Sequence, residues 1–469
     1  MAVKRYVASR DTTITNAFKP GLILRGTGSN MGEADSMEIF SIYGQAARTS
    51  RELSRALVQF PVSTIISERA AGTIPASGSV DFKLKLYNAK HPFTLPRKFY
   101  LKVQAVSSSW SEGWGMDCDE YSDDGYANWE VASSSSAGTS SWTADGGDYH
   151  TSPAYSAYFD RGHEDLELNV TPLVEEWIAG TKANYGLGVF LSSSHENALS
   201  SSYTKKFFAR GSEYFFQRPV IEAQWDSSIR DNRASFWSSS SLAPASDNLN
   251  TIYLYNIVRG SYTNIPGVGT GSIYLQIWDE KSAGTQLTST PITGGYYSTG
   301  IYTASFALQT TESYVYDRWF SAGLTTTYHT GSIKVNKLVG SNINANPQYL
   351  ISMPNLKGSY TQAETARFRL FVRQRNWCPT VYTKVVAESE GEIVENVYYR
   401  VSRVPDELTV IDYGTGSLNH TRMSYDVSGS YFDLDISLLQ PGYMYQVSYL
   451  FNLNDNYKEQ EETFRFRVD

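Results

Sequence analysis

The stretch VDFKLKLY, residues 80–87, alternates apolar and polar side chains at every second position. A period of two is typical of a strand with one buried and one solvated face. The same alternation recurs at residues 99–105, 187–191, 273–278, 367–373 and 463–468. Gly, Ser, Asn and Asp clusters separate these segments, as turns separate the strands of β-sandwiches. The sequence therefore predicts an all-β fold.

One helix is expected, over residues 171–180 (TPLVEEWIAG). Thr171 is the expected N-cap, a proline follows at the first helical position, and Gly180 ends the segment. Leu173, Val174 and Trp177 then share one face of the helix. We expect this short helix to lie between strands.

The composition and net charge of the chain limit the classes of function that we expect. The chain has 469 residues, 14% of them aromatic and 19% charged, and a formal net charge of −8. Its length predicts two to four domains. The negative charge argues against a nucleic-acid partner, which favours a basic protein. No run of 18 apolar residues occurs, so we expect no membrane span. The two cysteines, Cys118 and Cys378, lie too far apart in sequence for a disulfide framework.

Two segments without alternation suggest domain boundaries. Residues 226–250 contain a serine run and Ala-Pro steps, and residues 340–348 (GSNINANPQ) are rich in Asn and Gly. The predicted domains are therefore 1–226, 227–340 and 341–469. The second and third end alike, in a strand, a turn, a Tyr-rich strand and a last strand, which indicates two tandem immunoglobulin-like sandwiches.

Residues 11–226 resemble the DNRLRE-type jelly-roll domain. The motifs that carry the resemblance occur in order: DTTIT at 11, NMGEADSMEI at 30, RALVQFPVSTI at 55, VDFKLKLYN at 80, VSSSWSEG at 106, then LNVTPLVEEWIAG, NYGLGVFL and RPVIEAQW. The resemblance implies an N-terminal jelly-roll β-sandwich. The long insertion at 115–163 departs from the family pattern, because it is richer in Ser, Gly and acidic residues.

A jelly roll followed by immunoglobulin-like domains also resembles the virion structural proteins of tailed phages of the marine T4-like type. This implies a head-decoration, neck or tail accessory protein that docks onto other virion proteins as an oligomer in a symmetric assembly, without catalysis. The N-terminal MAVKRYVASR has no apolar core, so no secretory signal is expected. Synthesis in a host cytoplasm and assembly into the virion would explain that pattern.

Three groups of residues are candidate sites. Clustered carboxylates in GMDCDEYSDDGYANW would bind calcium, although their spacing differs from that of an EF-hand loop; they are Asp117, Asp119, Asp123 and Asp124. Four tryptophans crowd one region and would stack on sugars or anchor an interface, unless they pack a core; they are Trp110, Trp114, Trp129 and Trp142. A basic stripe would dock an acidic neighbour or simply face solvent; it comprises Arg367, Arg369, Arg373 and Arg375.

Two other functions stay open. A carbohydrate-binding attachment protein would use the jelly roll and the tryptophans. A polysaccharide-degrading enzyme needs two carboxyl groups facing one another across a cleft. Glu175 and Glu176 are adjacent on the predicted helix, so they point apart. Because no other catalytic constellation is recognisable, we expect no catalytic residues, and no cofactor apart from calcium.

Overall fold

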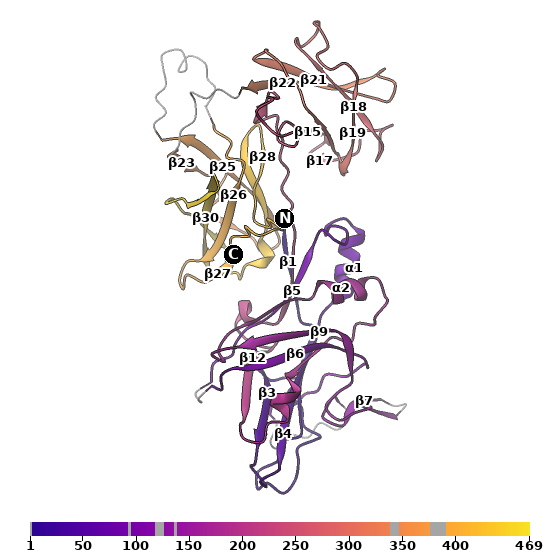
Figure 1. Ribbon diagram of the computed structural model, residues 1–469, viewed down its shortest axis with the longest axis vertical. Coiled ribbons are helices and arrows are strands. Elements are labelled where there is room, and N and C mark those ends of the chain that lie inside the picture. The colour runs from indigo at the N-terminus through magenta and orange to yellow at the C-terminus, as the bar shows by residue number, and fades with distance from the viewer. Residues whose placement is uncertain (1, 92–94, 118–125, 136–137, 338–346, 376–390) are drawn as a thin grey trace. The chain divides into compact units, whose positions relative to one another are not determined.

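The computed structural model describes residues 2–91, 95–117, 126–135, 138–337, 347–375 and 391–469, and strands dominate all of these parts (Figure 1). The chain divides into two compact units. One comprises Ala2–Asp226 with Gly416–His420, and the other comprises Ser227–Thr415 with Thr421–Asp469. The all-β prediction is confirmed.

Two antiparallel sheets build the first unit. The smaller sheet has the order β1 (Val3–Val7), β13 (Val220–Gln224), β5 (Asp81–Leu86) and β10 (Leu166–Asn169). The larger sheet has the order β12 (Tyr203–Phe208), β3 (Ser36–Tyr43), β4 (Arg51–Gln59), β11 (Leu187–Leu191), β6 (Phe99–Val106) and β9 (Tyr149–Phe159), and β2 (Arg10–Thr15) also pairs with β4. Strands adjacent in space are mostly distant in sequence, which is the crossing connectivity of a jelly-roll sandwich.

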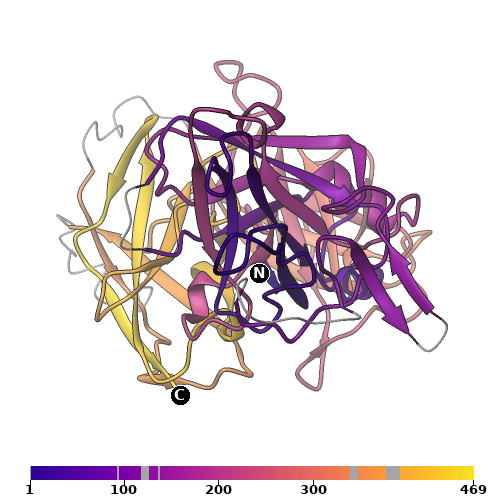
Figure 2. The ribbon, with the colours of Figure 1, turned by 90° about the horizontal axis from the view of Figure 1, so that it is seen from below.

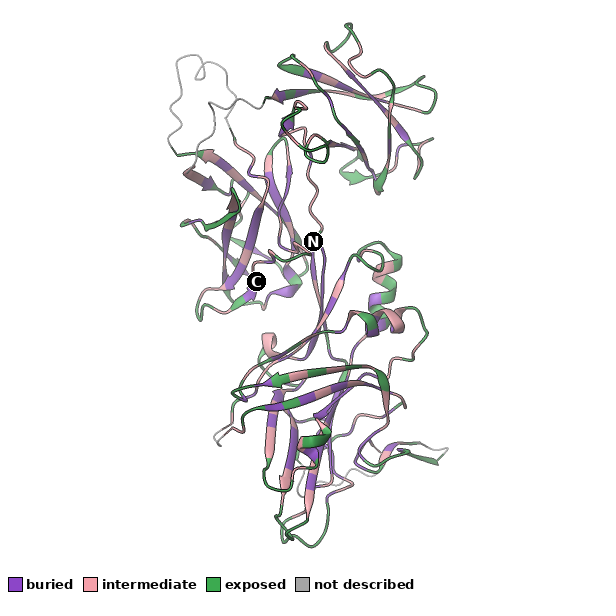
Figure 3. Ribbon diagram, in the orientation of Figure 1, coloured by how far each residue is buried: buried purple, intermediate pink, exposed green. Residues whose placement is uncertain are grey.

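The core of this unit lies between the two sheets. Phe82, Leu84 and Leu86 of β5 are fully buried there, and the intervening Lys83 and Lys85 remain partly exposed. Figure 3 shows the same alternation of buried and more exposed residues along other strands. The period of two seen in the sequence therefore positions this core.

Three α-helices occur among the described residues, α1 (Val62–Ala70), α2 (Thr171–Ile178) and α3 (Ser193–Glu196). The predicted helix is confirmed as α2, and its three predicted core residues are buried. Its N-cap is Val170, not Thr171. The Thr171 hydroxyl instead accepts a hydrogen bond from the Phe82 amide at 2.8 Å, because β5 lies directly beside it.

The described residues between β6 and β9, 107–117, 126–135 and 138–148, form a separate layer, which we call the 107–148 layer. Their hairpin of β7 (Val131–Ser135) and β8 (Gly138–Ser141) projects from the first unit in two perpendicular views (Figure 1 and Figure 2). Behind it lies a second, smaller apolar cluster that joins Ile14 and Leu57 to residues of this layer. Leu57, on the outer face of β4, is thus also buried.

The second unit begins with one curled sheet. Its order is β14 (Phe236–Trp237), β22 (Thr327–Asn336), β21 (Tyr314–Phe320), β18 (Ile273–Trp278), β19 (Ile292–Ser298), β20 (Ile301–Phe306) and β15 (Asn250–Tyr255), with a small hairpin of β16 (Ile257–Val258) and β17 (Ser261–Tyr262). β19 pairs with both β18 and β20, so the sheet folds around the buried Trp319 and Tyr302.

The last part of the chain is an immunoglobulin-like sandwich. One sheet has the order β23 (Tyr349–Ser352), β25 (Thr365–Gln374), β29 (Gly429–Asp435) and β28 (Ser424–Asp426). The other has the order β24 (Ser359–Tyr360), β32 (Phe464–Val468), β30 (Met444–Leu453), β26 (Val397–Arg403) and β27 (Thr409–Ile411), and β31 (Asn456–Glu459) pairs with β30. This is the A-B-E-D and G-F-C arrangement of that fold. The Tyr445 hydroxyl donates to the Gln440 carbonyl at 2.8 Å, which is the fold's tyrosine corner.

The expected linker, residues 226–250, is largely irregular but anchored. The Arg233 guanidinium pairs with the fully buried carboxylate of Asp317 at 2.7 Å, and the Trp319 indole N–H donates to the same carboxylate. Further upstream, the amide of Tyr425 on β28 donates to the Ile229 carbonyl. The second expected boundary, 340–348, falls mostly outside the described residues, and the predicted domain limits remain predictions.

Candidate functional site

A groove of about 1000 Å³ lies on the first unit, beside the β3–β12 edge of the larger sheet. Its wall combines the β2–β3 connection with residues of β3 and β4 and with short pieces around residues 95, 116 and 203. The lining residues are Ala17, Phe18, Met31, Glu33, Ala34, Asp35, Ser36, Glu38, Phe40, Ile42, Gln45, Glu52, Leu95, Pro96, Met116, Asp117, Ser202, Tyr203, Thr204 and Lys206. Its volume is at the upper end of small-molecule sites, so a ligand of several groups fits.

Strand alternation builds the apolar part of this groove. On β3, Met37 and Ile39 point into the main core, so Glu38, Phe40 and Ile42, at the alternate positions, face the other side. Phe40 is buried and Ile42 is partly exposed. The groove thus has an aromatic and aliphatic lining held by β3, next to the edge strand β12.

Carboxylates dominate the charge of the groove. Five acidic side chains line it against one lysine, a formal charge of −4. Glu38 pairs with Lys206, and the Glu52 carboxylate accepts a hydrogen bond from the Phe18 amide at 2.7 Å. Glu33 and Asp35 are exposed, and neither side chain has a hydrogen-bond or ion-pair partner among the described residues.

A buried carboxylate stands behind this edge. Asp11 accepts a hydrogen bond from the Arg210 amide at 2.6 Å, and the Arg210 guanidinium makes a bidentate pair with Glu112. Burial is the main cause that raises the pKa of Asp11 to about 7, and the nearby charge of Glu112 raises it further. One oxygen of Asp11 lacks a partner among the described atoms. Burial therefore favours the neutral form of Asp11 at pH values where an exposed carboxyl group is ionised.

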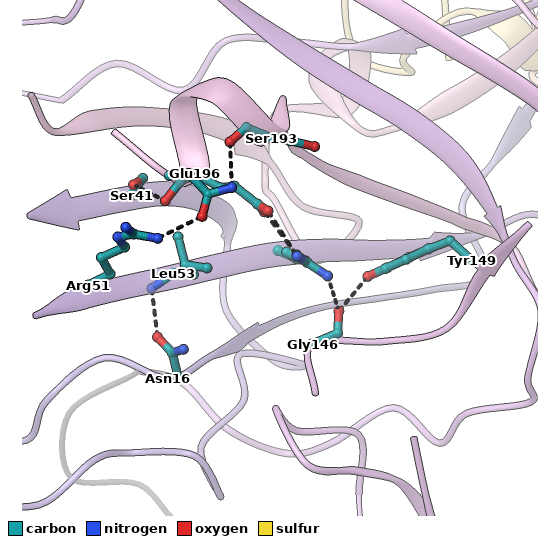
Figure 4. A network of polar contacts seen from close by, with 10 residues as sticks. Asn16, Ser41, Arg51, Leu53, Gly146, Tyr149, Ser193 and Glu196 are labelled. Atoms are coloured by element: carbon teal, nitrogen blue, oxygen red, sulfur yellow. Dashed lines mark hydrogen bonds and ion pairs between the residues drawn. The ribbon is translucent and has the colours of Figure 1, made fainter. Parts of the chain in front are cut away.

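A second polar network clamps the 107–148 layer onto the sheet (Figure 4). The Arg55 guanidinium on β4 makes two hydrogen bonds of 2.9 Å with the Glu196 carboxylate of α3 and one of 3.0 Å with the Gly146 carbonyl. The Tyr149 hydroxyl donates to the same carbonyl at 2.8 Å. The guanidinium also lies 5.0 Å from the Phe190 ring centre. These contacts give Arg55 a structural role.

Most of the predicted tryptophan surface is core. Trp110, Trp129 and Trp142 are buried in the cluster beneath the 107–148 layer, and Trp142 donates its indole N–H to the Asn128 carbonyl at 2.9 Å. These three rings cannot stack on a sugar or a partner, so their proposed binding role is corrected to packing. Trp114 is different, because 61% of it is exposed, with its ring 6.4 Å from that of Tyr126.

The predicted basic stripe is compensated within its own sheet. Arg367 makes a bidentate pair with Asp433 at 2.8 Å and 2.9 Å, and Arg369 makes one with Asp426. Both guanidinium groups lie over the Tyr431 ring. These hydrogen bonds are the main cause that raises the pKa of each arginine. Arg373 is partly exposed and Arg375 is exposed beyond them, so a docking role for the stripe stays a prediction.

The predicted calcium loop falls largely outside the described residues. Asp119, Asp123, Asp124 and Cys118 lie there, as does Cys378, whereas Asp117 lines the groove. Within the described ranges, no three His, Cys, Asp or Glu side chains are grouped so as to hold a metal ion. The calcium site therefore remains a prediction.

The two glutamates of α2 point to different partners. Glu175 forms a bidentate pair with Arg69 of α1, and Glu176 pairs with Lys182 at 2.6 Å. The two carboxylates therefore do not face one another across a cleft. Among the described helices, none is long and apolar enough to cross a bilayer.

Sequence analysis did not single out the groove. A sequence pattern that could have indicated it is GEADSMEIF, residues 32–40. Two acidic residues, at 33 and 35, precede β3, and a third, at 38, lies within that strand. The periodicity could place Glu38 and Phe40 on one face. The pieces at 95–96, 116–117 and 202–206 join them only through the folded chain.

These features define the class of protein in outline, an all-β chain of β-sandwich domains with a groove on the surface of its first unit. No protein-family model matches the chain, and no curated protein matches it in sequence. Similar solved structures include the Yersinia pseudotuberculosis adhesin InvE, with 12% identity and a TM-score of 0.16 over 46% of this chain and 54% of the adhesin. The N-terminal Ig1-2 module of the Drosophila receptor protein tyrosine phosphatase DLAR has 9% identity and a TM-score of 0.14, over 47% of this chain and 90% of the module.

The chain therefore matches about half the length of the adhesin. Likenesses at these TM-scores carry no inference about function. The assignment of the fold rests instead on the chain's own strand order and register.

Proposed function

We propose that this chain is a structural component of a tailed-phage virion, a head-decoration, neck or tail accessory protein that docks onto other virion proteins and catalyses no reaction. In this proposal the first unit is a DNRLRE-type jelly roll. The virion assignment is supported by the resemblance of the sequence to such proteins. The docking role is supported by one structural observation, an ordered loop that presents apolar side chains to solvent.

This loop, residues 18–25, connects two bridged residues of the β2–β3 segment. Leu22, Ile23 and Leu24 are 38%, 85% and 69% exposed. The Lys19 amide donates to the Leu24 carbonyl at 2.7 Å, and Phe18 and Arg25 form a bridge across the loop base. The Arg25 guanidinium also lies 4.3 Å from the Phe18 ring centre. These contacts close the base of the loop below the tip.

The conformation of the tip is energetically unfavourable. Leu22 has a φ of +57°, in the left-handed region that non-glycine residues rarely adopt. Three consecutive large aliphatic side chains in water add an unfavourable solvation term. Strained backbone and exposed apolar groups concentrate at functional surfaces, and a pre-ordered apolar anchor loses little entropy when it enters a partner's pocket. The tip thus suits protein docking.

Particle association tests this proposal. The producing lysate is fractionated on a density gradient, and the chain is counted by mass spectrometry in each fraction. We expect it to co-sediment with particles at a fixed copy number that matches the symmetry of the shell, neck or tail. A chain found wholly in the soluble fraction would contradict the virion assignment.

Substitutions at the tip test the docking surface separately. The double variant Ile23→Ser, Leu24→Ser should lose particle association while keeping its melting temperature, because both side chains lie in solvent. The matched control is Ile66→Ser, Leu199→Ser, two exposed apolar residues elsewhere on the first unit. Equal retention of both variants on particles would exclude the tip as the anchor.

A carbohydrate-binding attachment protein is the second candidate. The observation that favours it is a pair of exposed rings, Tyr100 on β6 and Tyr158 on β9, whose centres are 4.9 Å apart. Adjacent exposed aromatic faces can stack on sugar rings. Glycan-array binding that Tyr158→Ala abolishes, without release of reducing ends, would support this candidate over the virion assignment.

A further inference from the structure

The groove beside β3 and β12 and the apolar tip belong to one continuous segment. The groove is lined by Ala17 and Phe18, which begin the loop, and by residues 33–36, which follow it. The loop that carries the tip thus begins at the wall of the groove. What the groove recognises is set by its charge and its lining.

The charge of the groove is unbalanced. Glu33 and Asp35 lie at its wall without hydrogen-bond or ion-pair partners among the described residues. The charge of Glu33 also lies close enough to Asp11 to raise the pKa of that buried carboxyl. A cationic group placed here would relieve this repulsion and form charge-assisted hydrogen bonds.

The lining favours an organic cation. Phe40, Ile42 and Phe18 present aromatic and aliphatic surface next to the carboxylates. Arginine and lysine side chains have apolar stems that pack on such surface while their charged ends reach acids, and guanidinium groups also stack on aromatic faces. A small hydrated ion would make no use of this apolar lining.

We propose that the groove binds an arginine- or lysine-bearing segment of a partner protein. The proposal rests on the proposed docking function and names the chemistry of the partner's segment. Glu33 and Asp35 bind its cationic ends, and Phe40 and Ile42 contact its stems. Glu38, already paired with Lys206, supplies a further acceptor when a guanidinium competes with the lysine.

The test uses the full chain and a tetra-arginine peptide labelled with fluorescein as the probe. Binding is followed by fluorescence anisotropy at low and at physiological ionic strength. The variant Glu33→Gln, Asp35→Asn should weaken binding by about tenfold or more, because two charge-assisted contacts are lost. Both side chains are exposed, so the variant should retain the melting temperature of the unmodified chain.

The matched control is Glu130→Gln, Asp145→Asn. It removes the same charge from two exposed acids of the same unit that do not line the groove. Binding by the control should stay within about twofold of the unmodified chain, since distant surface charges are screened by salt. Equal weakening in both variants would show general electrostatic attraction and overturn the proposal. No detectable binding by the unmodified chain would also overturn it.

A neutral oligosaccharide, maltohexaose, is titrated in parallel. If it binds and Phe18→Ala or Ile42→Ser abolishes its binding, while tetra-arginine shows no groove-dependent binding, the groove is a sugar site and the peptide proposal fails. The gradient experiment remains independent. If the unmodified chain does not sediment with particles but binds the peptide in the groove, only the virion function is refuted. If it sediments with particles but does not bind the peptide, only the groove assignment is refuted.

Discussion

Asp11 and Glu222 are both buried carboxylates, yet their pKa values move in opposite directions. Burial raises the pKa of Asp11 to about 7, and its nearest charged neighbours include Glu112 as well as Arg210. Burial also opposes ionisation of Glu222, but the charges of Arg5 and Lys85, each at 2.7 Å, outweigh it and lower its pKa to about 2. At the residue scale, the direction of a buried carboxyl group's pKa shift is set by the charged partners that the fold places beside it.

The raised pKa of Asp11 predicts a pH dependence of stability. Its stabilising contribution is present below pH 3.8 and is lost as pH rises through about 7. The unfolding free energy of Asp11→Asn, relative to the unmodified chain, should therefore increase by about 4 kcal/mol between acidic and neutral pH. Urea denaturation across this range measures it. A difference independent of pH would contradict the raised pKa.

Glu222 contributes to stability with the opposite pH dependence. Its stabilising contribution is present above pH 4.5 and is lost as the pH falls toward about 2.

At the scale of elements, long-range polar contacts attach peripheral segments to the sheets. Arg55 of β4 and Glu196 of α3 are 141 residues apart in sequence. Together with the Gly146 carbonyl they hold α3 and the 107–148 layer against the same face. Alternation along β4 places Arg55 on that face, but its partner depends on where the chain returns after β11.

Removal of the Arg55 side chain should loosen this layer. Arg55→Met leaves Glu196 buried without its counterion, so we expect a loss of about 3 to 5 kcal/mol in unfolding free energy. Urea denaturation measures the loss, and hydrogen exchange should show reduced protection at residues 127–132. The exposed Arg48→Met is the control, with an expected change within about 0.5 kcal/mol. Equal effects of the two variants would refute a clamping role.

At the scale of the whole molecule, each compact unit contains its own apolar core. Leu84 belongs to the core of the first unit, and Leu275 to one in the second. Domains with separate cores can unfold as separate cooperative units. We therefore expect the two units to unfold as separate cooperative units.

Core truncations should act on different calorimetric transitions. Leu84→Ala and Leu275→Ala remove fully buried side chains, so each should destabilise its own unit by about 2 to 5 kcal/mol. Differential scanning calorimetry should show each variant lowering one transition and leaving the other in place. A single transition lowered by both variants would show that the units unfold together.

The sequence by itself determined the strands, because alternation is a local property that each stretch such as VDFKLKLY carries alone. It also determined α2, whose apolar face follows from local spacing. The tertiary structure decided which side chains meet. It buried three of four tryptophans, paired Arg367 with Asp433 across adjacent strands, and assembled the groove from segments distant in the chain. Strand register and chain crossing set those contacts, and neither is encoded within one short segment.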